Sequence, residues 1–287
     1  MSTQITTAFV EQYSSNIQML SQQKGSLLRD KVRVESVVGK NAFFDQVGSV
    51  TATVRSSRHS DTPQADTPHS RRRVSLADYE FADLIDDLDK VRMLVDPTSS
   101  YAMAAAFAMG RAMDDVIITA ATGDASTGVA GGTTTALPAG QIIAEAGTTG
   151  MNIAKLREAK EILDLADVDP SLPRFIVVSP KQITDLLGTT EVTSSDFNTV
   201  KALASGDVNS FLGFNFIVSN RLAVATQIRD CFAFVSDGIT LALGKDVTAR
   251  IDERADKGYA TQVYYSMAIG ATRMEEEKVV KIQAYEA

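Results

Sequence analysis

A long polar stretch, residues 46–76, constrains the fold of this chain more than any other feature. Only 7 of its 31 residues are hydrophobic, against 44% for the whole chain of 287 residues. Hydrophobic and polar residues alternate over 50–55 and over 73–76, which predicts two strands joined by a turn-rich tip that contains Pro63 and Pro68. A two-stranded hairpin with so few apolar side chains is at best marginally stable in water. The stretch is therefore either a flexible surface loop or a hairpin that another surface supports.

Blocks of opposite charge follow one another at this point of the chain. Residues 46–76 contain five arginines and two aspartates, a net charge of +3, and residues 77–96 contain seven acidic and two basic residues, a net charge of −5. Adjacent blocks of opposite sign favour a surface that pairs with a second copy of the same chain. The candidate inter-subunit contacts in the two blocks are Arg55, Arg58, Arg71, Arg72, Arg73, Asp83, Asp86, Asp87 and Asp89.

Three of these arginines are consecutive. Because side chains alternate along a strand, Arg71 and Arg73 are expected on one face and Arg72 on the other. We predict that they hold the hairpin against an acidic surface on an adjacent subunit, either the aspartates at 83–89 or the turn Glu275–Glu277. The alternative is that the arginines only keep an edge strand soluble.

The N-terminal residues 6–24 predict a short amphipathic helix that Gly25 ends. An isolated helix of this length is marginal in water, so it has to dock on its own chain or on a neighbour. Its narrow apolar stripe supplies further candidate inter-subunit contacts, which are Phe9, Tyr13, Ile17 and Leu20.

The rest of the chain predicts an α+β fold. Apolar spacing favours a partly helical segment at 81–88 and two full helices, at 98–121 and 152–167. The glycine-rich stretch 122–150 is expected to be a loop. The later elements are expected to be strands at 174–178, 214–218 and 231–235, a helix opened by Ser179-Pro180 and closed by Gly188, and an antiparallel meander over 247–252, 261–269 and 280–284.

Composition excludes several classes of protein. A net charge of −8 argues against a general nucleic-acid binder, which needs a clustered surplus of Lys and Arg. A single cysteine permits no disulfide within the chain and no cysteine-based zinc site. No apolar run is long enough for a membrane span, and the first residues lack the basic start and apolar run of a signal peptide. We therefore expect the protein in a cytoplasm-like compartment.

The sequence contains no recognisable catalytic motif. Phosphate-binding, dinucleotide-binding, zinc-protease and nucleophile-elbow patterns are all absent. His59 and His69 lie in the polar tip, which offers no rigid frame for catalysis or for a metal. Cys231 is followed by Phe232 and Phe234 on an expected strand, which is typical of a core residue and not of a nucleophile. No catalytic residue, cofactor-binding residue or metal ligand is therefore predicted.

The order of elements resembles that of the major capsid proteins of tailed bacteriophages, which share the Hong Kong ninety-seven fold. Residues 9–16 (FVEQYSSN) and 21–29 (SQQKGSLLR) look like the N-terminal arm of one capsid subfamily. Residues 174–180 (RFIVVSP) and 213–220 (GFNFIVSN) look like segments of the capsid axial domain. The resemblance covers nearly the whole chain.

The resemblance implies a division into five parts. We expect an N-terminal arm at 1–36, an extended loop at 37–80, a peripheral domain with its spine helix at 81–171, an axial domain at 172–237, and C-terminal strands at 238–287 that return to the peripheral domain.

The resemblance also implies a structural role without catalysis or a cofactor. Copies of the chain are expected to form pentamers and hexamers that close into an icosahedral shell, assembled in the host cytoplasm and found in the virion. The expected partners are the chain itself, a portal protein, a separate scaffolding protein (because the arm begins almost at Met1), and enclosed double-stranded DNA bound without sequence specificity; no membrane is expected. A net charge of −8 suits a wall that does not bind packaged DNA tightly.

Two alternatives stay open. An encapsulin-like bacterial compartment shares the fold and would co-purify with a cargo enzyme. An enzyme of unrecognised type, with its site in the 122–150 loop, would show turnover by dispersed subunits.

Overall fold

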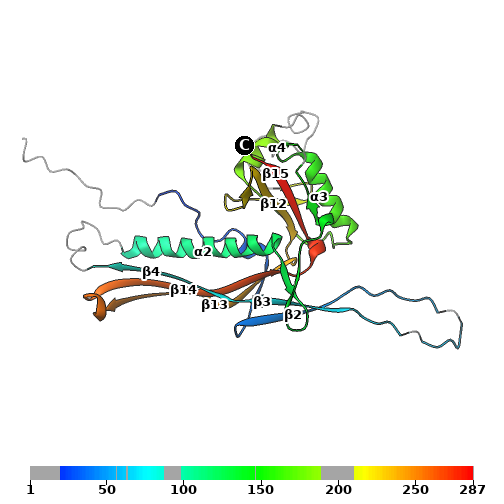
Figure 1. The fold of residues 1–287 in the computed structure, drawn as a ribbon, viewed down its shortest axis with the longest axis horizontal. Helices are drawn as coiled ribbons and strands as arrows, with labels where there is room; N and C mark the ends of the chain where they lie inside the picture. The colour runs from blue at the N-terminus through cyan, green and yellow to red at the C-terminus, as the bar shows by residue number, and fades with distance from the viewer. Residues whose placement is uncertain are drawn as a thin grey trace, which may run out of the picture.

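The structure is a computed structural model, and it describes residues 20–55, 57–62, 64–86, 98–145, 147–188 and 210–286. Figure 1 shows an elongated lower body, a second lobe above one end of it, and a long loop that projects beyond that end. Three sheets underlie these parts. The described strands and helices give an α+β protein, as predicted.

The lower body is a four-stranded sheet with one long helix laid along it. The strand order is β1 (Arg33–Ser36), β13 (Ile239–Arg254), β14 (Ala260–Arg273) and β4 (Ala77–Ile85), and only the β1–β13 pair is parallel. The helix is α2 (Thr98–Thr122), which confirms the helix predicted at 98–121. Buried side chains on α2 and on β14 belong to one apolar core, including Met113, Ile117, Met267 and Ile269.

The upper lobe contains a seven-stranded sheet with two helices (Figure 1). Its order is β7 (Ile142–Ile143), β15 (Val279–Tyr285), β12 (Ile228–Val235), β8 (Arg174–Val178), β10 (Phe214–Val218) and β9 (Ser210–Phe211), with β11 (Val224–Ala225) paired to β12. The helices are α3 (Ile153–Leu165) and α4 (Pro180–Leu187). Every residue of β8 is buried, because β10 and β12 pair with it on both sides within the core.

The third sheet forms the base of the projecting loop. Its order is β2 (Asn41–Val47), β3 (His69–Ser75), β5 (Ala125–Thr127) and β6 (Thr133–Thr135). The β2–β3 pairing ends at Val47 opposite His69, with one further hydrogen bond from the Gly48 amide to the Pro68 carbonyl at 2.9 Å. Three-residue 3-10 turns complete the described elements at Arg29–Lys31, Ala139–Gln141, Ala255–Lys257 and Glu276–Lys278.

The helices and strands predicted between 152 and 273 are confirmed. Asn152 caps α3 by accepting from the Lys155 amide, and Pro180 occupies the first turn of α4, which Gly188 ends. The strands at 174–178, 214–218 and 231–235 are β8, β10 and part of β12. β13 and β14 form the predicted antiparallel hairpin, with Gly258 at a positive φ of 62° in its turn.

Five sequence predictions are wrong in part. The segment 81–88, expected to be helical, is a strand as far as Ile85, because Tyr79, Phe81 and Ile85 alternate toward the interior opposite β14. The first hairpin strand is 41–47 and not 50–55. The stretch 122–150 is not all loop, since β5 and β6 extend the hairpin sheet.

The other two corrections concern the ends of the chain. The C-terminal strands do not form one meander, because β15 leaves the β13–β14 hairpin and pairs with β12 in the upper sheet. Residues 20–24 are not helical, since their polar groups bind α2 instead, as described below. The rest of the predicted N-terminal helix lies outside the described residues.

Candidate assembly surfaces

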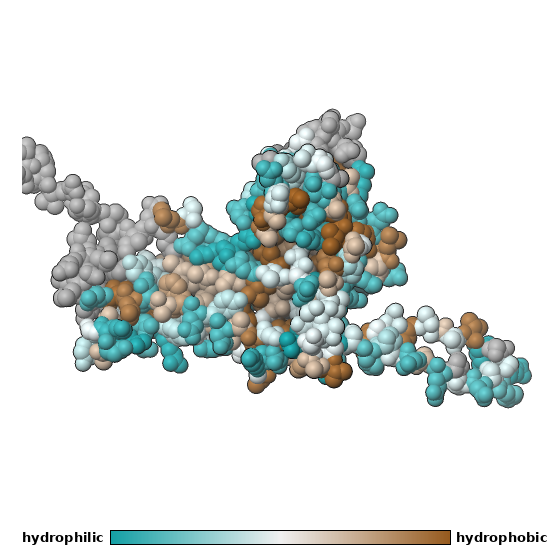
Figure 2. Space-filling view, viewed as in Figure 1, coloured by the Kyte–Doolittle hydropathy of each residue, from teal (hydrophilic) through white to brown (hydrophobic). Residues whose placement is uncertain are grey.

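The projecting loop is the most exposed part of the described chain. Figure 2 shows it as a thin and mostly hydrophilic extension of the body. The side chains of Val50 and Val54 are 56% and 96% exposed. Arg55 donates to the backbone carbonyls of Ser57, at 2.9 Å, and of Arg58, so its guanidinium shapes the tip of the loop. The two arginines at the tip, Arg55 and Arg58, are thus exposed on a surface with no apolar support from its own chain.

Arg71 binds within its own hairpin. Its Nε lies 2.5 Å from Asp45 Oδ1 and its Nη2 lies 3.1 Å from Asp45 Oδ2, on the strand paired with it. Its guanidinium also stands over the Phe43 ring, 5.6 Å from the centroid. The hydrogen bond from Arg71 holds the pKa of Asp45 below its ordinary value. Both side chains are exposed, so this pair contributes little to stability.

Arg72 points to the opposite face, as predicted, but it is buried inside its own subunit. Its Nη2 lies 2.7 and 2.6 Å from the two carboxylate oxygens of Glu276, and its Nε donates to the Met274 carbonyl at 2.9 Å. The turn at 275–277 therefore does supply the partner, but from the same chain. The prediction that Arg72 binds an adjacent subunit is wrong, because its Nε and Nη2 bind within the subunit and only 8% of its side chain is exposed.

A second buried arginine meets the same carboxylate. Arg273 is fully buried and lies 3.8 Å from Glu276. It donates to the carbonyls of Ala121 and Gly123 at the end of α2, and to the Thr135 carbonyl on β6. Burial lowers the pKa of this guanidinium. Arg72, Glu276 and Arg273, which we call the loop-base triad, thus join the hairpin sheet to the end of α2.

Arg73 completes the contacts at the loop base. Its Nη1 donates to the Ala130 carbonyl at 3.4 Å, between β5 and β6. Gly131, at a positive φ of 67°, leaves room for this arginine, because a Cβ there would lie 2.4 Å from the Arg73 Cδ. All three consecutive arginines therefore have intrachain partners.

The end of the N-terminal arm crosses α2 at a buried carboxylate. Asp114 is 1% exposed and accepts from the side chains of Gln23 and Ser26, each at 2.5 Å, and from the amides of Leu27 and Leu28. The backbones nearly touch at this crossing, since a Cβ on Gly110 would lie 2.4 Å from the Gly25 carbonyl carbon. We call this set of contacts the arm anchor.

The arm is held on both sides of this crossing. Arg111 donates to the Gln22 side chain at 3.0 Å, and Arg29 pairs with Asp246 on β13 at 2.6 Å. Leu20, at the outer end of the described arm, is 87% exposed. The other three residues of the predicted stripe, Phe9, Tyr13 and Ile17, lie outside the described residues.

The acidic segment lies on and beyond the edge strand β4. Asp83 is half-buried and accepts from the adjacent Leu84 amide, whereas Asp86 is exposed just past the strand. Asp87 and Asp89 lie outside the described residues. Within the described part, neither aspartate meets the arginines of the loop, because β4 and the loop run to opposite ends of the body (Figure 1).

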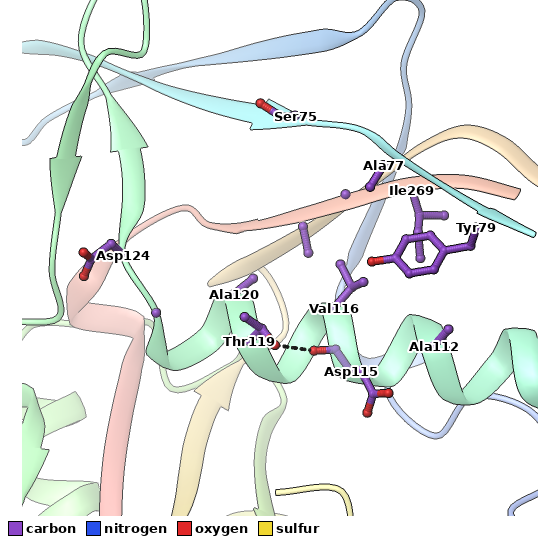
Figure 3. A pocket seen from close by; sticks show the side chains of 13 residues that line it. Ser75, Ala77, Tyr79, Ala112, Asp115, Val116, Thr119, Ala120, Asp124 and Ile269 are labelled. Carbon is purple, nitrogen blue, oxygen red and sulfur yellow. Dashed lines mark hydrogen bonds between the residues drawn. The ribbon is translucent and has the colours of Figure 1, made fainter. Parts of the chain in front are cut away.

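A cleft of about 410 Å³ separates α2 from the start of β4 (Figure 3). Tyr79 on β4 faces Val116 and Thr119 on α2 across it, and Thr119 Oγ1 donates to the Asp115 carbonyl at 2.8 Å. The Asp115 carboxylate itself pairs with Arg221 of the upper lobe. The residues that line the cleft include no nucleophile hydrogen-bonded to a base, so the cleft is a groove between α2 and β4 without a catalytic pair.

Other chemistry is limited in the described residues. Cys231 is buried, which confirms the predicted core residue, and burial raises the pKa of its thiol to about 12, so the thiolate form is disfavoured near neutral pH. No group of three or more His, Cys, Asp or Glu side chains there is arranged to hold a metal ion. No helix in the described ranges is long and apolar enough to cross a membrane.

Comparison with known structures defines the class of fold. The chain superimposes on the capsid protein of cyanophage P-SCSP1u with a TM-score of 0.77 at 18% identity, covering 100% of this chain and 96% of the other. For the capsid of Helicobacter pylori bacteriophage KHP30 the TM-score is 0.76 at 11% identity, covering 99% of this chain and 98% of the other. For the capsid of Ralstonia phage GP4 the TM-score is 0.75 at 11% identity, covering 97% of this chain and 96% of the other. The fold is that of phage major capsid proteins.

The family follows from the sequence. A family model described as phage capsid protein matches residues 5–286, so the chain belongs to the phage capsid protein family. No curated protein sequence matches it. The protein is a structural capsid protein, and neither the bacterial compartment nor the enzyme alternative is favoured by these findings.

Proposed function

We propose that this chain is the repeating subunit of an icosahedral phage shell, built from pentamers and hexamers that enclose the double-stranded DNA genome. The observation that carries the proposal is the projecting loop. Its base is fixed by the loop-base triad, yet residues 48–68 leave the body and expose apolar side chains such as Val54. Holding a weakly supported loop away from the body is favourable when a neighbouring subunit covers it.

The division into arm, loop, peripheral domain and axial domain is part of this proposal. The arm at 1–36, the loop at 37–80 and the body around α2 fit the described contacts. We assign β7, α3 and β15 to the upper lobe, and so propose that the axial domain includes 142–165, 172–237 and the last strand, while β13 and β14 belong to the peripheral domain. The inter-subunit contacts that we retain are Arg55, Arg58, Asp83, Asp86, Asp87, Asp89 and the arm residues Phe9, Tyr13, Ile17 and Leu20.

Partners and location complete the proposal. A separate scaffolding protein and a portal protein would direct assembly in the host cytoplasm, and the finished shell would be part of the virion. The net charge of −8 supports a wall that repels packaged DNA more than it binds it.

Sedimentation and negative-stain imaging of the purified chain, alone and with a co-expressed scaffolding protein, test this function. Closed shells with five-fold and six-fold rings are expected. A protein that stays monomeric in material taken from virions would contradict the proposal.

A further inference from the structure

Residues 50–54 have the sequence of a strand but do not form one. Four of the five are β-branched (Val50, Thr51, Thr53 and Val54), the residue class that strands favour. In the structure they have no regular secondary structure, and no strand of the described chain pairs with them. The local sequence and the observed conformation therefore disagree at this place.

The opposite side of the loop explains the disagreement. Residues 62–68 (TPQADTP) contain two prolines, which have no amide hydrogen and do not fit a paired strand. The hairpin pairing accordingly stops at the hydrogen bond from Gly48 to Pro68. Backbone groups of 50–54 are thus left to water or to another chain.

We propose that residues 50–54 add as a strand to the open edge of β4 in a second copy of this chain. The inference rests on the proposed shell, because it needs a neighbouring copy, and it specifies the contact that the loop makes there. Among the described strands β4 pairs with β14 alone, so all nine of its residues belong to the outer strand of its sheet.

Charge selects β4 among the available edges. In the described residues, three strands have an open edge of five residues or more: β2, β4, and β13 beyond its pairing with β1. β4 carries Asp78, Glu80 and Asp83 with no basic residue, whereas the segment 50–58 carries two arginines and no acidic residue. The single acid of β2 is already paired with Arg71, and the open part of β13 has equal numbers of acidic and basic residues.

Geometry requires that the edge belong to another copy. β3 and β4 follow one another through Leu76 alone, and they place the loop tip and β4 at opposite ends of the long axis (Figure 1). The loop at one end of a subunit would therefore contact the β4 edge at the other end of the next subunit. This is a head-to-tail contact, and such contacts close into rings when they are repeated.

Single proline substitutions test the strand directly. In a strand that pairs on one edge, the amides of alternate residues face the partner. Thr51→Pro and Thr53→Pro remove amides on one side of the strand, and Ala52→Pro and Val54→Pro remove amides on the other side. One of these two pairs of variants should therefore lower the association constant for assembly about fivefold for each hydrogen bond lost. The other pair should assemble as well as its controls, which are the alanine variants at 51, 53 and 54 and, for position 52, the unsubstituted chain.

The first readout is shell yield by sedimentation. The second is the melting temperature of dispersed subunits, which should be the same for all four variants because the segment is exposed. Equal effects of all four prolines, or no effect of any, would overturn strand addition while leaving the shell function intact. Failure of the unsubstituted chain to assemble at all would overturn the shell function itself.

Charge reversal tests the choice of edge. Glu80→Lys should weaken assembly, more at low salt than at high salt, and Arg55→Glu with Arg58→Glu should restore it. Asp252→Lys on β13 is the matched control and should have little effect. If Asp252→Lys weakens assembly and Glu80→Lys does not, β4 is the wrong edge and the proposal fails.

Discussion

Glu276 is the residue on which the base of the projecting loop depends. Its carboxylate accepts two hydrogen bonds from Arg72 and lies 3.8 Å from Arg273, and only 17% of its side chain is exposed. Two guanidinium groups that are almost fully buried thus share one counter-charge. Burying charges is favourable only while the partners remain together.

Replacing this carboxylate should therefore destabilise the subunit. Glu276→Gln removes the counter-charge and leaves both buried arginines, so the free energy of unfolding should fall by about 3 kcal/mol. Urea unfolding of dispersed subunits measures it. Glu277→Gln, in the same turn but exposed, is the control and should change stability by no more than about 0.5 kcal/mol. Equal stability of the two variants would contradict the assigned role of Glu276.

Gly110 permits the close crossing of the arm over α2. A Cβ at this position would lie 2.4 Å from the Gly25 carbonyl carbon, 2.6 Å from its Cα and 2.7 Å from the Ser26 nitrogen, all of them backbone atoms. Gly110→Ala should displace the arm and cost about 1–3 kcal/mol, in spite of the better helix propensity of alanine. Amide exchange of residues 22–28 should increase. Gly132→Ala, where a Cβ would meet nothing within 4 Å, is the control and should leave exchange unchanged.

At the scale of elements, the last strand is fastened to the upper lobe by a carboxylate. Glu286 follows β15 and accepts from Arg229 on β12, at 2.8 Å, and from Ser179 and Gln182 at the start of α4, at 3.1 and 3.3 Å. The hydrogen bond from Arg229 lowers the pKa of Glu286 below its ordinary value of 4.5. The ionised form is therefore the one that the fold stabilises.

This shift predicts a loss of stability in acid. Because the pKa is lower in the folded state, the contribution of Glu286 is complete above pH 4.5 and is lost as the pH falls toward the folded-state value. The difference in unfolding free energy between the unsubstituted chain and Glu286→Gln should shrink between about pH 6 and about pH 3.5. Urea unfolding at both values measures this difference. A difference that is the same at the two pH values would exclude this role for Glu286.

The elements that sequence predicts well are those with one dominant pattern. α2 has a long helical repeat, and β8 is a short run of four apolar residues after Arg174, and for both the sequence predicts limits within one residue of those observed. β4 satisfies two patterns, because Phe81, Leu84 and Ile85 have helical spacing while Tyr79, Phe81 and Ile85 alternate. Pairing with β14 decides between them, and no local signal contains that information.

The same limit applies to the candidate surfaces. Composition and charge identify the loop and the acidic segment, but they do not identify the partners of single side chains. Arg72 and Glu276 are 204 positions apart in the sequence, and Gln23 and Asp114 are 91 positions apart. Partners at such separations are set by the whole fold, which is why the sequence alone predicts a partner for Arg72 on a neighbouring subunit. Nothing in the sequence around Asp114 distinguished it from an exposed helix aspartate.

At the scale of the whole molecule, the arm has two parts with different roles. Residues 22–28 form the arm anchor on α2, and Leu28 is 1% exposed within the core of the subunit. Leu20, only two residues outside the anchor, is 87% exposed, and the apolar stripe of Phe9, Tyr13 and Ile17 precedes it in the sequence. The anchor belongs to the fold, and for the apolar stripe that precedes it we propose a contact with a neighbour.

Two truncations should separate these roles. Removing 1–19 leaves the anchor intact, so the free energy of unfolding of dispersed subunits should be unchanged, while shell yield falls because the apolar stripe is lost. Removing 1–28 also deletes Leu28, which is buried in the core, and every donor to Asp114 described above, and should cost about 3 kcal/mol or more. Urea unfolding and sedimentation of both truncated chains measure the two effects. Normal shell yield after removal of 1–19 would show that the stripe makes no contact needed for assembly. An unchanged free energy of unfolding after removal of 1–28 would show that the anchor is not part of the fold.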